Sequence, residues 1–69
     1  MNSVERASRE IGLSHLQSET LGWHINGLDY NYEQVLACAL AIQRMNAIEC
    51  RTAIAAFAYA QYPSRGHNC

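Results

Sequence analysis

The chain contains no lysine, one proline, one phenylalanine and four glycines among its 69 residues. Its five arginines are set against six acidic residues, which leaves a net charge of −1 at pH 7. A general nucleic-acid binder needs a cationic surface, and an acidic mimic of DNA needs a clear excess of carboxylates. The charge balance fits neither class, and we expect no nucleic-acid partner.

Long apolar runs are also missing. The longest extends from Val35 to Ile42 and ends at Gln43 and Arg44, whereas a membrane span needs roughly 20 apolar residues. The first ten residues lack the basic start and apolar centre of a signal peptide. The sequence therefore predicts a cytoplasmic protein that does not bind or cross a membrane.

The three cysteines do not form the pattern of a disulfide framework, because their number is odd. Cys38 and Cys50 lie in apolar stretches, where a reduced thiol behaves as a small hydrophobic group. Close to the end, His67 and Cys69 make one His-x-Cys unit, but structural zinc sites use two closely spaced ligand pairs. We expect reduced thiols, no metal site and no cofactor.

Catalytic patterns are absent as well. A side-chain nucleophile needs a base within reach and a third group to orient that base. The serines, cysteines and histidines of this chain are scattered without such a pattern. A chain of this length also has little material with which to enclose a substrate. The sequence therefore predicts that the protein is not an enzyme.

The rest of the chain is organised around residues 31–62, which contain nine of its ten alanines and neither glycine nor proline. Alanine, leucine, glutamine and glutamate are strong helix formers. Two capping-box patterns, which satisfy amide donors at helix starts, are Asn31 with Gln34 and Asn46 with Glu49. These features predict two helices, at about 32–45 and 47–61, packed as an antiparallel pair. A single unbroken helix is the competing interpretation.

Each predicted helix carries more than one apolar stripe at about 100° per residue. In the first, the main stripe is Val35, Cys38, Ala39, Ile42 and Met45. In the second, one stripe is Cys50, Ala53, Ile54, Phe57 and Ala58. The other is Ile48, Thr52, Ala55, Tyr59 and Tyr62. Packing the two helices together covers one stripe of each, so the remainder needs the N-terminal third, a second copy or another protein.

The N-terminal third predicts two shorter helices. Ser3 can cap the first helix, which runs to about Ile11 and stops at Gly12. Ser14 with Gln17 makes a capping box that opens the second helix.

A β-hairpin competes with the end of that second helix. Apolar and polar residues alternate from Leu21 to Tyr32 on both sides of Asn26-Gly27, a pairing typical of hairpin turns. We favour the helix, since a lone two-stranded hairpin is marginally stable in water. The fold class is accordingly all-α: one small helical domain over residues 1–62 with a C-terminal antiparallel helix pair, a short hairpin at 21–32 as the alternative, and a flexible tail over 63–69.

Two segments resemble parts of the Cro/repressor type of DNA-binding module. They are IGLS at 11–14 and TLGWHING at 20–27, followed by a further helix. In that family a helix ends at glycine, a turn follows, and the recognition helix ends near Asn-Gly. Here the interval from the turn to Asn-Gly is longer, and the matching helix HLQSETLGWHI has no arginine or lysine to contact phosphates. The resemblance implies a divergent helix-turn-helix DNA-binding protein as the alternative function.

Protein recognition is the function that these features favour. Tryptophan, tyrosine and arginine carry much of the binding energy at protein interfaces. Together with the uncovered stripe, they predict a partner-binding set made of Arg44, Ile48, Arg51, Thr52, Ala55, Tyr59, Tyr62, Trp23 and Tyr30. A core of this size is marginal alone, which favours a homodimer or attachment to a larger host protein.

The use of arginine without lysine is typical of GC-rich bacterial or phage genes. We therefore predict a small interaction module of the kind encoded by phages and other mobile elements. It would act as an inhibitor that binds and blocks a host bacterial protein complex, as anti-CRISPR or anti-regulator proteins do.

Overall fold

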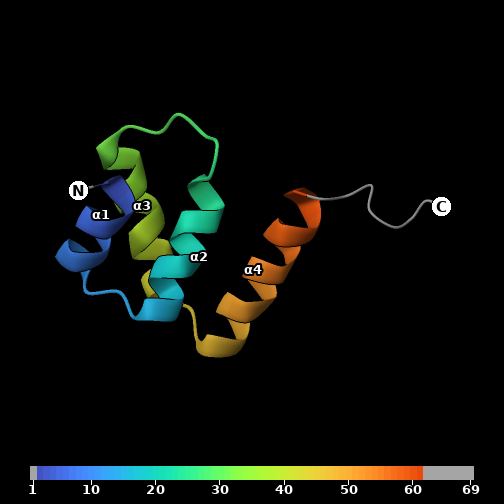
Figure 1. Cartoon of the computed structure of the whole chain (residues 1–69). Helices are drawn as coiled ribbons and strands as arrows, with labels where there is room; N and C mark the ends of the chain where they lie inside the picture. The colour runs from blue at the N-terminus through green and yellow to red at the C-terminus, as the bar shows by residue number, and fades with distance from the viewer. Residues whose placement is uncertain (1, 62–69) are drawn as a thin grey trace.

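The computed structural model describes residues 2–61 and folds them into four α-helices (Figure 1). The helices are α1 (Ser3–Ile11), α2 (His15–Ile25), α3 (Tyr32–Gln43) and α4 (Ala47–Gln61). The all-helical prediction is confirmed, and no strand occurs within residues 2–61. Tyr62 and the predicted tail at 63–69 lie outside the described residues.

The hairpin alternative at 21–32 is wrong. Its first half belongs to α2, which ends where Gly27 adopts a positive φ of 78° and the Leu28 amide donates to the Ile25 carbonyl at 2.9 Å. Its second half contains Asn31, which caps α3 and so places Tyr32 in a helix. Asn26-Gly27 suits both a hairpin turn and the end of a helix, and here it ends a helix.

The unbroken-helix alternative is also wrong, because residues 44–46 separate α3 from α4. Three reciprocal capping boxes, each with both hydrogen bonds between 2.8 and 3.1 Å, open the later helices: Ser14 with Gln17, Asn31 with Gln34, and Asn46 with Glu49. All three were visible as short sequence patterns, and the third is what restarts the helix after the break.

The N-cap of α1 lies one residue earlier than predicted. Asn2, not Ser3, is the N-cap, and its side-chain oxygen accepts from the Glu5 amide at 2.8 Å. Asparagine and serine are comparable caps, so the choice depends on where the helical angles start. The end of the helix is as predicted: Gly12 has φ 84°, and its amide donates to the Ser8 carbonyl at 2.8 Å.

The core lies between α1, α2 and α3. Its buried members are Ala7, Leu21, Val35, Ala39 and Ile42, and the predicted inner stripe of α3 supplies three of them. Two of the five are alanines, which contribute little apolar area, so Leu21 and the β-branched residues provide most of the burial.

The last two helices differ from the prediction in their partners. They have the expected positions in the chain, but α4 packs mainly against α2, whereas α3 packs mainly against α1. Figure 1 shows α4 (orange) beside α2 (cyan), with α3 (green) on the other side of α2. The expected antiparallel pairing of the two C-terminal helices is therefore replaced by contact between α2 and α4.

Two glutamines hold the joint between α3 and α4. The Gln17 side-chain amide donates to the Gln43 and Met45 carbonyls, each at 3.0 Å. The Gln43 side-chain amide donates to the Ile11 carbonyl, also at 3.0 Å. These bonds satisfy carbonyls that a helix end leaves open, and they fix the point from which α4 departs. None of the helices described here is long and apolar enough to cross a membrane.

Candidate functional site

The face of α4 that points away from α2 is the most conspicuous exposed apolar surface in the described chain. Ile48 is 70% exposed and Tyr59 is 75% exposed, the highest values among the large hydrophobic side chains. Arg51, Thr52 and Ala55 are exposed between them. We refer to these five residues as the α4 outer face.

The exposure follows from helical periodicity. The opposite side of α4 carries Cys50, which is fully buried, and Phe57, which is half-buried. The same side holds Ala53, Ile54 and Ala58, so the stripe predicted to face inward does so. Since α4 has α2 as its main neighbour, its remaining stripe has no helix within residues 2–61 to cover it.

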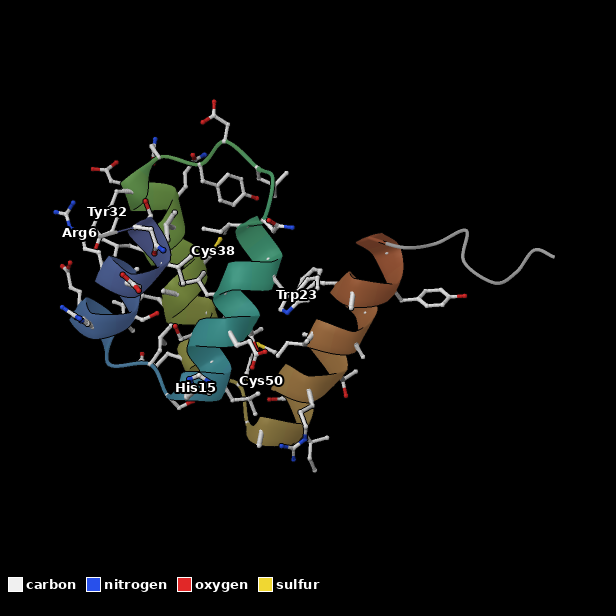
Figure 2. All side chains as sticks on the ribbon, in the orientation of Figure 1. Arg6, His15, Trp23, Tyr32, Cys38 and Cys50 are labelled. Carbon is white, nitrogen blue, oxygen red and sulfur yellow. The ribbon has the colours of Figure 1, made fainter. Side chains whose placement is uncertain are left out.

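Aromatic contacts hold the C-terminal half of α4 against α2. The His24 ring meets the Phe57 ring edge-on, with centroids 5.4 Å apart and an interplanar angle of 60°. Trp23 is half-buried and lies between α2 and α4 in Figure 2. Edge-on aromatic pairs add a modest stabilisation to the area that they bury, so these side chains position the α4 outer face and are not part of it.

The structure divides the predicted partner-binding set. Its exposed members lie on or just before α4: Arg44, Ile48, Arg51, Thr52, Ala55 and Tyr59. Tyr30 packs against the core, and Trp23 faces α4, so these two do not join the α4 outer face. Tyr62 lies outside the described residues. Whether the six exposed residues bind a partner stays a prediction.

A hollow of about 270 Å³ opens between α2, α3 and α4. Its lining is mainly apolar: Thr20, His24, Cys38, Ala41, Ile42, Met45, Ala53 and Phe57. The Thr20 hydroxyl already donates to the Leu16 carbonyl at 2.8 Å, so it offers no free donor. Sequence reasoning missed His24 and Phe57 as neighbours, because the two residues lie 33 positions apart in the chain. The only signal was the place of Phe57 on the inner stripe of α4.

A second hollow of about 560 Å³ runs along α2 beside the start of α1. It is lined by Val4, His15, Ser18, Glu19, Gly22, Trp23 and Asn26. Gly22 leaves it shallow and open, because no heavy atom lies within 4 Å of where its side chain would begin. Among these residues Glu19 is the acidic group, and none is arginine or lysine.

A small polar cluster joins α1 to α3 at the opposite end of the molecule. The Tyr32 hydroxyl donates to the Glu10 carboxylate at 2.8 Å, and the Arg6 guanidinium lies 4.1 Å from the Tyr32 ring centroid (Figure 2). Burial against α1, followed by the hydrogen bond and the negative charge of Glu10, raises the pKa of Tyr32. The cluster links α1 to α3 through side chains of both helices.

Within the described residues, no three histidine, cysteine or acidic side chains gather as metal ligands, and Cys38 and Cys50 are free thiols. The helix that matches the repressor recognition helix is α2, which packs against α1, α3 and α4. Its exposed side chains are His15 and Glu19. Comparison of the chain with protein families, with curated proteins and with solved structures yields no match.

Proposed function

We propose that this protein is a small protein–protein interaction module that binds a larger protein through the α4 outer face. The observation that carries the proposal is the exposure of Ile48 and Tyr59 on a helix whose main neighbour within the fold is α2. A large apolar group that stays in water forgoes about 1.5–3 kcal/mol of burial. Two such groups on one face, with small residues between them, make a surface that a protein partner can cover.

The chemistry of this face fits protein better than nucleic acid. Tyr59 and Arg51 belong to the residue types that dominate binding energy at protein interfaces. The charged residues of α4 are Glu49 and Arg51, one of each sign, whereas binding to nucleic acid draws on several cationic contacts to phosphates. Helix α2 exposes Glu19 and contains no arginine or lysine, which argues against its use as a recognition helix.

The role that we propose for the module is inhibition. A single domain of this size, with no catalytic pattern and with arginine as its basic residue, fits a small phage- or mobile-element-type inhibitor. Such a protein acts by occupying a surface on a larger bacterial complex. It therefore needs to bind that surface tightly and needs no catalytic groups.

The test compares capture of bacterial proteins by the wild-type chain and by Tyr59→Ala and Arg51→Ala variants. Leu40→Ala is the matched control, because Leu40 is a large apolar residue, 51% exposed, on α3. We expect either α4 variant to weaken capture about tenfold or more, with unchanged helicity by circular dichroism, while Leu40→Ala captures normally.

Equal capture by all four proteins would refute a role for the α4 outer face. A salt-dependent shift of duplex DNA by the wild-type chain would instead support the repressor-like alternative.

A further inference from the structure

The α4 outer face is complementary to itself when the helix is turned end over end. Ile48, Thr52, Ala55 and Tyr59 follow a 4-3-4 spacing, which is the seam spacing of paired helices. The large side chains lie at the two ends of the face, and the small ones lie in the middle. Reversal therefore sets Ile48 of one copy against Tyr59 of the other, and lets the two backbones approach closely where Thr52 meets Ala55.

The charges favour the same reversed arrangement. Arg44, Glu49 and Arg51 lie before or in the first half of α4, and residues 52–61 carry no charge. Parallel helices would bring the two charged halves together and align their dipoles. Antiparallel helices place each charged half beside the uncharged C-terminal half of the other α4. That end has no basic residue of its own in its last turn, and a nearby cation stabilises it.

We propose that a second copy of this chain binds the α4 outer face, paired antiparallel about a two-fold axis that passes between Thr52 and Ala55. A two-fold contact uses the same surface on both copies, which is what a self-complementary face provides. This inference rests on the proposed function in one respect, namely that the α4 outer face binds protein.

The dimer is a weak and reversible one. Helix α4 has 15 residues and is therefore about 22 Å long at a rise of about 1.5 Å per residue. A single helix pair of this length lies at the small end of protein interfaces, below about 1,200 Å² of buried surface. A larger partner can then displace the second copy, because both use the same face.

Sedimentation equilibrium tests the dimer. From about 1 µM to about 300 µM we expect the mass of the wild-type chain to rise from one chain toward two, each chain being 7.7 kDa. Ile48→Ser and Tyr59→Ser should stay at the mass of one chain, with unchanged circular dichroism, and Leu40→Ser should behave as wild type. A wild-type chain that remains monomeric throughout, or a dimer that only Leu40→Ser disrupts, overturns the inference.

The orientation is tested by charge at position 56. In the antiparallel pair, Ala56 of one copy lies on the same flank as Glu49 of the other, whereas in a parallel pair it lies beside Arg51. Ala56 is exposed on a helix, so lysine or glutamate fits there. We expect Ala56→Lys to tighten the dimer about three- to fivefold through two added ion pairs, and Ala56→Glu to weaken it. The opposite order, or no difference between the two variants, refutes the antiparallel arrangement.

The experiments distinguish failure of the interaction module from failure of the dimer. If Tyr59→Ala loses capture of a bacterial protein while the wild-type chain is a monomer, the interaction module stands and the dimer is wrong. If the chain dimerises through Ile48 and Tyr59 but captures nothing that depends on them, the dimer stands and the inhibitory role is wrong.

Discussion

Leu21 is the largest side chain that is fully buried, at 0% exposure in the core between α1, α2 and α3. Leu21→Ala removes it without lowering helix propensity, since alanine is the better helix former. Deleting a buried leucine costs about 2–5 kcal/mol, because the transfer energy of the lost atoms adds to the cost of the cavity. A domain of 69 residues, at about 0.05–0.15 kcal/mol per residue, has only about 3–10 kcal/mol in total.

The buried alanines near Leu21 increase the stability that we expect Leu21→Ala to lose. Ala7 and Ala39 are also fully buried, and neither can move a side chain into the space that Leu21 leaves. We expect a loss of about 3 kcal/mol or more. With a urea dependence of about 1 kcal/mol per molar, the midpoint should fall by about 3 M, as followed by circular dichroism.

Leu40→Ala is the control for the same chemical change at a half-exposed site. Leu40 is 51% exposed on α3, so its loss should cost less than about 1 kcal/mol. If both variants cost the same, or if Leu21→Ala costs less than about 1 kcal/mol, the assignment of Leu21 to the centre of the core is wrong.

Three further predictions concern the caps, the polar cluster and the attachment of α4. Asn46→Ala removes the side chain that accepts from the Glu49 amide at 2.8 Å, and it should cost about 1 kcal/mol in urea unfolding; an unchanged midpoint would mean that this capping box does not hold the start of α4. Tyr32 has a pKa raised above its usual 10.0, so the unfolded chain loses that proton first as the pH rises, and the stabilisation present below pH 10 is lost above it. Alkaline titration of thermal stability should show a smaller loss in Tyr32→Phe, and an identical profile would contradict the bond to Glu10. In a dilute sample, hydrogen exchange should be faster in α4 than in α3, because α4 has only one main neighbour; equal protection of the two helices would show that α4 is held more firmly than its contacts imply.

Helix α4 has an inner stripe that packs on α2 and an outer face that stays in water. Its inner stripe has one fully buried member, Cys50, and otherwise half-buried ones. Its outer face leaves Ile48 and Tyr59 in water. A second copy or a larger partner on that face would stabilise the helix by mass action.

The helix boundaries of this protein can be predicted from short stretches of sequence. Asn31 with Gln34 and Asn46 with Glu49 each form within four residues, and a positive φ is easy only for glycine, as at Gly12. The apolar stripes of α3 and α4 are equally local, since they depend on periodicity alone. These are interactions between near neighbours in sequence, so a pattern of residue types is enough to reveal them.

The packing partners of the helices could not be predicted from such short stretches. Nothing near α4 in the sequence indicates that it packs on α2, that His24 meets Phe57, or that Tyr30 packs against the core. Each of these depends on how four helices share one small core, and on the bonds by which Gln17 and Gln43 fix the joint. Local chemistry therefore set the helices and their faces, and only packing between distant segments decided which helix covers the inner face of α4, because burial is a property of the whole assembly of helices and not of any one of them.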